Sequence, residues 1–404
     1  MSSAAQPRRV SPENDQAAPG VGISSPATNE SRSAAAKRSP EIRIRPASLD
    51  DYPKITALES RHSLQSKPRE EWEHLWNSNP IYRRLSSGWP VGWVLEDRSK
   101  EIVGFLGNIP LSYEFGGKNY LVATTRSWVV DVAYRPYSLL LLDYFFDQQT
   151  VDLYITTSLN CEASKGFRSF GPTPVPVGNW DRSSFWITSY VDFVESMMRT
   201  KQIGFAKPIS YVIAPLLFAK DRLQVKSLRR GKAEVRIQSA FDESFDAFWE
   251  ALKKIHPRTL LGARNREVLE WHFKYPLRRG EVWILSIYDG ARLLAYSIFY
   301  RQDNPKFGLK RLRLADFQTL ETDERLLTPM LSSALQRCQT EGISMLEIIG
   351  LGAQKARIVS EIAPYQRKLT SWLAFYKTTR PELIECLSDN ACWDFSCFDG
   401  DISL

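Results

Sequence analysis

Residues 129–146 read VVDVAYRPYSLLLLDYFF, an apolar strand that passes through a short turn into an apolar helix. Val130 and Val132 fall on the strand, and the helical pattern begins after it, from Pro136 onwards. The first turn of a helix carries backbone N–H groups without intrahelical partners, and these attract anions. The stretch predicts a strand, a turn and a buried helix.

A second stretch, SLNCEASKGFRSFGP at residues 158–172, directly follows the apolar strand VDLYITT. Asn160 can begin a short helix. Gly166 is expected to end that helix in a left-handed conformation, and Phe167 to begin an extended segment. Because open α/β sheets bind ligands at the carboxyl ends of their strands, this stretch could form a ligand cleft or could be architecture alone.

Working outward, the pattern over residues 41–197 is strand, two helices, three strands, helix, strand, short helix, strand. The same order returns over residues 233–379. The helical segment REEWEHLWNSNP (69–80) is matched by NREVLEWHFKYP (265–276), and both place a Trp shortly before a Pro. The sequence predicts an α/β fold (α+β, mixed sheets) built as two tandem domains.

Three segments fall outside this repeat. Residues 1–39 are rich in Ser, Ala and Pro and are predicted to be a disordered tail. Residues 198–232 are predicted to be a linker that packs partly as a helix, with a membrane-surface role as an alternative. Residues 380–404 form a C-terminal extension.

Composition narrows the class of protein. With 43% hydrophobic and 25% charged residues, the chain is expected to be soluble and globular, without a transmembrane segment. The net charge of +7 comes without a nucleic-acid recognition motif. We therefore expect no DNA partner, and the charge fits a phosphate-bearing cofactor equally well.

Five cysteines and four histidines leave little for metal or disulfide chemistry. No cysteine pair has CxxC spacing, so no metal site is expected. Reduced thiols in a cytoplasmic protein are the prediction, and Cys161 is expected to be a buried thiol.

The order of elements, with the strand EIVGFLG at residues 101–107, resembles the GNAT acyltransferases (Gcn5-related N-acetyltransferases), in particular bacterial tandem-GNAT proteins. The resemblance implies that the fourth strand splays from the fifth and opens a cleft for the pantetheine arm. It also implies acetyl-CoA or another acyl-CoA as co-substrate, with its pyrophosphate on the turn of residues 129–146.

In the matching motif, Arg135 takes the place of the leading Arg, Tyr137 lies in the variable pair, and Ser138 and Leu140 replace the two small residues. Pro136 has no N–H to donate. The cofactor-binding residues implied by the resemblance are Val130, Val132, Arg135, Tyr137, Ser138, Leu139, Leu140 and Asn160. Ser138 is expected to cap the helix, and the N–H groups of residues 138–140 to face the cleft.

The resemblance makes Asn160 the Asn that starts a helix beside the pantetheine arm, although a simple N-cap is an equal alternative. The Tyr that often protonates the departing thiolate is missing. A backbone N–H near Val132 could polarise the thioester carbonyl. Asp131 is the candidate base on the fourth strand, or else a surface carboxylate, and a water chain through Ser127 or Thr125 and the carboxylate of Glu162 are alternatives. Four tryptophans, Trp89, Trp93, Trp180 and Trp186, could line an acceptor path or belong to the core.

The second half lacks the phosphate motif, and Glu321, Asp323 and Glu324 occupy the corresponding turn, where their charge would repel phosphate. Its expected role is structural. The leading hypothesis is an acyl-CoA-dependent N-acyltransferase that transfers an acyl group, acetyl first, to a small amine such as an amino sugar or amino acid. The alternatives are a GNAT-fold scaffold without catalysis and a FemAB-type transferase that uses aminoacyl-tRNA. The sequence leaves the acceptor and the oligomeric state open.

Overall fold

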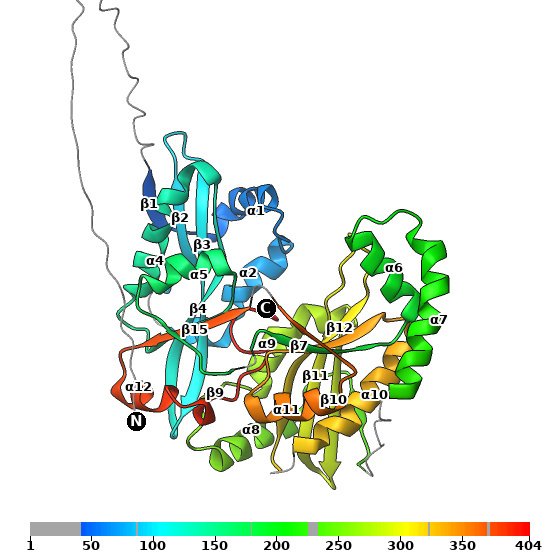
Figure 1. The fold of residues 1–404 in the computed structure, drawn as a ribbon. Helices are drawn as coiled ribbons and strands as arrows, with labels where there is room; N and C mark the ends of the chain where they lie inside the picture. Colours follow the sequence, from blue (N-terminus) through cyan, green and yellow to red (C-terminus); the bar gives the residue numbers. More distant parts are fainter. Residues whose placement is uncertain (1–41, 86–87, 179, 225–232, 322–323, 370–371) are drawn as a thin grey trace, which may run out of the picture. The chain divides into compact units, whose positions relative to one another are not determined.

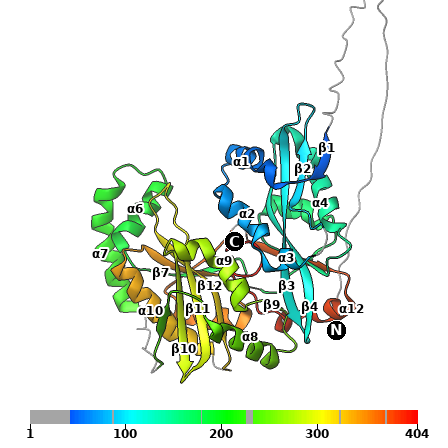
Figure 2. The same ribbon diagram turned by 180° about the vertical axis from the view of Figure 1, so that it is seen from behind.

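The computed structural model describes residues 42–85, 88–178, 180–224, 233–321, 324–369 and 372–404, so the predicted tail, residues 1–39, lies outside the described part. Residues from 42 onwards form two mixed sheets with helices against them (Figures 1 and 2). This confirms the predicted α/β class with mixed sheets.

The first sheet has the order β1-β2-β3-β4-β5-β15-β6, and β9 pairs with β3. β4 and β5 run parallel, whereas the other neighbours are antiparallel. Its strands are β1 (Arg43–Pro46), β2 (Gly92–Glu96), β3 (Ile102–Phe115), β4 (Lys118–Val130), β5 (Leu153–Leu159), β6 (Thr173–Pro174), β9 (Leu261–Gly262) and β15 (Leu373–Thr378).

The second sheet has the order β14-β7-β13-β12-β11-β10-β8, and here β12 and β13 are the parallel pair. Its strands are β7 (Arg182–Ile187), β8 (Arg236–Gln238), β10 (Val282–Asp289), β11 (Arg292–Arg301), β12 (Arg311–Thr319), β13 (Met345–Ile349) and β14 (Tyr365–Lys368).

Each half gives its last strand to the other sheet. β7 follows the elements of the first half but pairs with β13 and β14, and β15 follows those of the second half but pairs with β5 and β6. The sheets therefore do not divide at the predicted limits of residues 41–197 and 233–379. The alternation of apolar residues determines which face of a strand is buried, but it does not determine which strand it pairs with.

Helices cover both sheets. In the first sheet, α1 to α3 and α4 with α5 lie on opposite faces, as the front and back views show (Figures 1 and 2). The helices are α1 (Tyr52–Arg61), α2 (Arg69–Asn77), α3 (Pro80–Arg84), α4 (Ser138–Phe146), α5 (Cys161–Arg168), α6 (Tyr190–Thr200), α7 (Ala206–Gln224), α8 (Glu243–Ile255), α9 (Arg266–Arg278), α10 (Leu327–Thr340), α11 (Ala353–Ile362) and α12 (Pro381–Leu387). Short 3₁₀ helices precede or follow some of them: η1 (Leu49–Asp51), η2 (Val132–Tyr137), η3 (Glu324–Leu326) and η4 (Asn390–Cys392).

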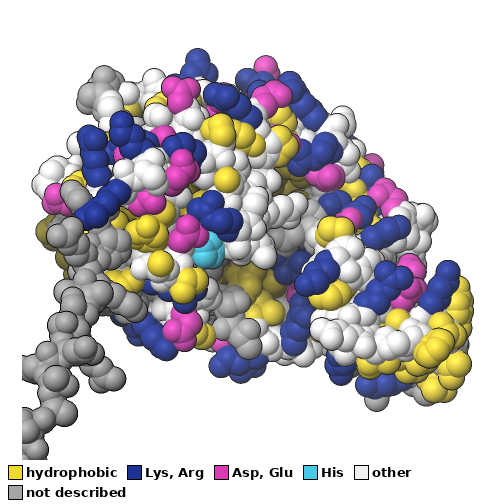
Figure 3. Space-filling view, turned by 90° about the horizontal axis from the view of Figure 1, so that it is seen from above, with side chains coloured by type: hydrophobic (Ala, Val, Ile, Leu, Met, Phe, Trp, Pro, Cys, Tyr) yellow, Lys and Arg dark blue, Asp and Glu magenta, His cyan; other side chains and the backbone are white. Residues whose placement is uncertain are grey.

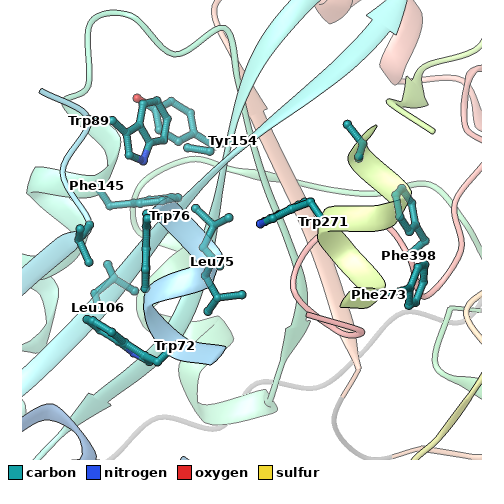
Figure 4. Packing of buried hydrophobic residues seen from close by; sticks show 14 of the residues in the cluster. Trp72, Leu75, Trp76, Trp89, Leu106, Phe145, Tyr154, Trp271, Phe273 and Phe398 are labelled. Atoms are coloured by element: carbon teal, nitrogen blue, oxygen red, sulfur yellow. The ribbon is translucent and has the colours of Figure 1, made fainter. Parts of the chain in front are cut away.

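The two segments that match in sequence, α2 and α9, pack against each other. The Trp271 indole donates to the carbonyl of His74 at 3.1 Å, and the His74 ring lies 2.9 Å from the carbonyl of Trp271. Trp72 and Trp76 contact each other beside it, with their rings tilted by 58° and their centres 4.8 Å apart (Figure 4). Since these side chains belong to one buried cluster with Phe273 and Phe398, the repeated motif builds the core that joins the halves.

The predicted linker, residues 198–232, was expected to pack partly as a helix, and it contains the end of α6 and the whole of α7, while residues 225–232 lie outside the described part. Two expectations about the cysteines need correction. Cys386 and Cys392 form a disulfide, contrary to the expectation of reduced thiols. The chain folds back between α12 and η4. This brings the Cα atoms of the two cysteines to 6.2 Å, within the range of a disulfide. Cys161 is exposed at the start of α5 rather than buried.

Candidate functional site

The first sheet splits between its two parallel strands. β4 and β5 are bonded only from Val122 opposite Leu153 to Thr124 opposite Ile155. Beyond this point β4 pairs with β3 and β5 pairs with β15, but not with each other. We call the diverging ends, residues 125–130 and 156–159, the fork. Backbone groups on the facing edges of a fork are available to an extended ligand.

The β4 side of the fork is bent by an irregularity. Ser127 has a φ of +52°, and the register with β3 shifts between Phe105 and Gly107. A bulge of this kind increases the local twist and re-aims a strand's end. The strand then stops at Val130. Val132 was predicted on the strand, but it opens the 3₁₀ helix η2 with 67% of its side chain exposed.

The turn that the resemblance assigns to the pyrophosphate folds as η2 followed by α4, although its details differ from the expectation. Tyr137, not Ser138, is the N-cap of α4, and no side chain caps it. The Ser138 N–H donates to the carbonyl of Arg135 and is therefore already used. Arg135, Leu139 and Leu140 are exposed at the start of this helix, so the turn offers a cation and apolar side chains.

Asn160 begins α5 at the other arm of the fork. Its Oδ1 accepts from the backbone N–H of Ala163 at 2.8 Å, which is N-cap geometry. Gly166 does not end the helix as predicted, because α5 continues to Arg168 and the left-handed residue is Gly171, with φ +72°. A Cβ on Gly166 would lie 2.9 Å from Leu139 Cδ2, so this glycine allows α5 to pack closely on α4.

Asp131, the predicted base, forms ion pairs with Arg61 and His62 at the end of α1. One oxygen lies 2.8 Å from Arg61 Nη2 and the other 2.9 Å from His62 Nε2. Burial alone would raise the pKa of Asp131, but the hydrogen bonds from Arg61 and His62 outweigh it and the net pKa lies below the usual value. A carboxylate held ionised in this way is a weak proton acceptor.

A different carboxylate, Asp401, lies at the fork. Thr157 Oγ1 and Ser158 Oγ, both on β5, donate to Asp401 Oδ1 at 3.3 and 3.1 Å. Desolvation raises the pKa of Asp401, and the nearby charge of Arg126 offsets only part of this rise. Gly400, with φ +79°, allows the approach, because a Cβ there would lie 2.3 Å from Thr157 Oγ1.

One basic group, Arg126, acts on Asp401, and other titratable groups lie near the residues that follow it. Arg126 on β4 donates to the backbone oxygen of Leu404 at 3.3 Å, and His272 of α9 lies 2.8 Å from Ser403 Oγ. Desolvation, followed by the charge of Arg126, lowers the pKa of Lys67 to about 8. Burial, with Lys67 nearby, lowers the pKa of His272 to about 3, so this ring is neutral. Residues 400–404 thus lie in a site lined from β4, β5, α9 and the segment before α2.

The second sheet also has a fork, but another part of the same C-terminal segment fills it. β12 and β13 are bonded only from Arg311 to Arg313. Beyond, the Phe398 N–H donates to the carbonyl of Ala315 on β12, and Cys397 Sγ donates to that of Ile349 on β13. A pocket of about 620 Å³ outside this fork is lined in part by Glu321 and Lys355. Asp323 and the Glu324 side chain lie outside the described part.

A buried ion network fixes the C-terminal segment between the forks. Arg264 donates to Asp316 of β12 at 2.9 Å and to Asp399 at 3.0 Å, and all three side chains are at most 2% exposed. Tyr113 of β3 also donates to Asp399, at 3.0 Å. The predicted extension, residues 380–404, is therefore part of the core of both halves.

Other predicted site features lie elsewhere. Trp89, Trp93, Trp180 and Trp186 are all buried in the hydrophobic clusters. Among the residues that the structure describes, no cluster of His, Cys, Asp or Glu could hold a metal ion. Asp401 and Arg126 were missed, and the signal for them was local: a glycine followed by an acid in FDGDISL, and an arginine inside the strand KNYLVATTRSWVV, which is otherwise uncharged after its first residue.

Comparisons with known proteins now bear on the fold. No family model and no curated sequence matches the chain. In structure it is similar to Saccharomyces cerevisiae N-myristoyltransferase with bound myristoyl-CoA and inhibitors, with a TM-score of 0.55 at 12% identity over 90% of this chain and 84% of that one. The chain has the GNAT fold. A GCN5-related N-acetyltransferase from Kribbella flavida is similar too, with a TM-score of 0.52 at 11% identity over 86% of this chain and 74% of that one. This structural similarity establishes the fold, as the resemblance predicted. At identities this low it does not establish the reaction, which is argued from the geometry of the site.

Proposed function

We propose that this protein is an acyl-CoA-dependent N-acyltransferase whose thioester lies in the fork of β4 and β5. The observation that carries the proposal is the fork itself, which stands in a GNAT fold between two chemically different surroundings. The β4 arm leads to the start of α4, whereas the β5 arm leads to Asn160 and carries the Thr157 and Ser158 hydroxyls that donate to Asp401. In the second sheet, the corresponding position is filled by the chain's own residues 397 and 398.

The coenzyme would lie along the fork with its pyrophosphate at η2 and α4. Arg135 supplies a positive charge, and the N-terminal end of α4 adds the positive end of its dipole. Val132 and Leu140 are exposed beside it and can contact apolar parts of the coenzyme. The amide of Asn160 lies at the β5 arm, where the pantetheine would pass.

The acceptor amine would approach Asp401. The raised pKa of this carboxylate suits a group that takes a proton from an amine as its nitrogen attacks the thioester carbonyl. A C–N bond forms and the C–S bond breaks. The proton taken by Asp401 then passes to the departing thiolate, which leaves as the free thiol of coenzyme A.

The finer assignments follow the same proposal. Acetyl is the first acyl group to test, and a small amine such as an amino sugar or amino acid is the first acceptor class. A cytoplasmic location remains a prediction. A scaffold without catalysis would also have a Ser138 N–H that is bonded within the turn, and Ser138 and Leu140 in place of the two small motif residues. Experiment distinguishes the enzyme from the scaffold.

The test is release of free thiol from acetyl-CoA and longer acyl-CoAs, measured with and without a panel of amino sugars and amino acids. Amine-dependent thiol release by the full chain supports the proposal. If no acyl-CoA yields thiol with any amine, and none raises the melting temperature, the scaffold is the better account. A FemAB-type transferase would instead bind tRNA in a salt-dependent way.

A further inference from the structure

The helices α6 and α7 form a hairpin, and most of the larger apolar side chains of α7 are exposed. On α7, the buried residues are small or polar: Ser210 and Ala214 are at most 3% exposed, and Asp221 is 6% exposed. Val212 and Leu216, four residues apart on one face, are 68% and 69% exposed. In most helices of globular proteins the apolar stripe faces the core, so the orientation of α7 is inverted.

The exposed apolar side chains are contiguous enough to form a surface. We call this surface the hairpin patch. Its members lie on α6, on α7 and on the turn between them, and each is at least 37% exposed: Met197, Ile203, Phe205, Tyr211, Val212, Ile213, Leu216 and Phe218. Phe205, in the turn, is the most exposed at 84%. Figure 3 shows hydrophobic side chains gathered at the edge where Figure 1 places α7.

The charge around the hairpin patch has one sign. Residues 196–220 contain no Asp or Glu but include Arg199, Lys201, Lys207 and Lys220. The nearest acids are engaged: Glu195 pairs with Arg199, and Asp221 accepts from the hydroxyls of Tyr190 and Tyr365. Lys201 and Lys207 are exposed at the tip, and their charge is available to an anionic partner.

We propose that the hairpin patch docks this protein on the surface of an anionic lipid bilayer. Exposed Phe, Leu and Tyr side chains with lysines among them insert at the boundary of headgroups and acyl chains, and the lysines contact acidic headgroups. Charge complementarity favours this occupant over a second copy of the chain, because two hairpin patches of like charge repel. Among the described residues no helix is long and apolar enough to cross a membrane, so the contact is peripheral.

The experiment is co-sedimentation of the full chain with vesicles of phosphatidylcholine alone or mixed with phosphatidylglycerol. The protein should bind the mixed vesicles, and binding should weaken as salt rises from about 0.1 to 0.5 M. The triple variant Phe205→Ser, Val212→Ser, Leu216→Ser should bind at least about tenfold more weakly, since it removes most of the inserted apolar area. Lys201→Gln with Lys207→Gln should lower binding to the mixed vesicles and the effect of salt on it.

A matched triple variant, Leu64→Ser, Ile237→Ser, Ile384→Ser, changes exposed apolar residues elsewhere (43%, 53% and 53%) and should bind as the wild type does. Circular dichroism melts would confirm that both variants fold. No binding of the wild type, or equal loss in both triple variants, overturns the proposal. So does a wild-type dimer that only the hairpin variant converts to a monomer, because the patch would then be covered by a second copy. None of these outcomes depends on acyl transfer.

Discussion

The hydroxyl oxygens of Thr125 and Thr156 lie 3.1 Å apart at the last point where β4 and β5 touch. One residue before them, the strands are joined by ladder hydrogen bonds, and two residues after them Asp401 is bonded to Ser158. This pair of threonines thus marks the apex of the fork. Changes on either side of it make separate predictions about stability and about chemistry.

Gly400→Ala tests whether the C-terminal segment is fitted to the fork. The new Cβ would lie 2.3 Å from Thr157 Oγ1, and the backbone φ of +79° is strained for Ala. We expect a loss of about 2 to 4 kcal/mol in the free energy of unfolding, measured by urea denaturation. Gly280→Ala has a similar φ of +69° and open space around it, so it should lose only about 1 kcal/mol. Equal losses would show that the close approach to Thr157 does not matter.

Asp401→Asn tests the proposed base. If the function proposed above holds, activity should rise with pH through the raised pKa of Asp401, since only the ionised carboxylate accepts a proton. The variant should lose this limb of the pH profile and roughly 10²-fold or more in kcat, while acyl-CoA binding is kept. Asp131→Asn should keep the limb, because Asp131 pairs with Arg61 and His62. A retained limb in Asp401→Asn would assign the base to another group.

The buried carboxylate of Glu347 is expected to make the stability of the second sheet depend on pH. This side chain on β13 is fully buried among Arg311, Arg313 and Arg367 and accepts from Ser183 on the exchanged strand β7. Burial opposes ionisation, but the arginines outweigh it and lower the pKa of Glu347 to about 2. The carboxylate therefore stabilises the fold above its ordinary pKa near 4.5, and this contribution, about 3 kcal/mol, is lost as pH falls through 2.

The measurement is the melting temperature against pH for the wild type and for Glu347→Gln. The variant should be less stable at neutral pH, because three arginines lose their partner, and its stability should fall less between pH 5 and 2. If the two curves run parallel over that range, the assigned shift is wrong.

Asp399→Ala tests the ion network that holds the segment between the forks. It would leave the buried Arg264 with Asp316 as its only carboxylate partner among the described residues, and would remove the acceptor of the Tyr113 hydroxyl. We expect a loss of roughly 3 to 5 kcal/mol in unfolding free energy. Asp303→Ala breaks the exposed pair with Arg301 and should cost less than about 1 kcal/mol. If both variants lost a similar free energy of unfolding, burial would not increase the contribution of the Arg264 ion network to stability.

The sequence predicted local elements well where a single period dominates. The segments around Trp76 and Trp271 were expected to be helices and are, because their apolar residues follow a helical repeat. That the two helices pack on each other was not predicted. The exchange of β7 and β15 also escaped prediction, since strand pairing depends on contacts across more than 150 residues and not on the strand's own pattern.

The site was predicted only in part. The order of elements led to the fork and to the α4 turn, but Gly166 was taken for a helix end although its role is close packing against Leu139. Asp131 was chosen because it is next to the turn in sequence, whereas its partners Arg61 and His62 come from α1. Asp401 lies about 240 residues from Ser158 in sequence, and only the folded chain brings them together.

The most direct test of the central claim is calorimetric titration of the full chain with acetyl-CoA and longer acyl-CoAs, using a variant that blocks the fork. Ser158 is exposed on β5 beside Asp401, and Ser360 is exposed on α11 of the other half. The account predicts that an acyl-CoA binds the wild type, that Ser158→Trp weakens this binding at least about tenfold, and that Ser360→Trp leaves it unchanged. Absence of binding by the wild type, or a Ser158→Trp variant that binds as tightly as the wild type, would contradict it.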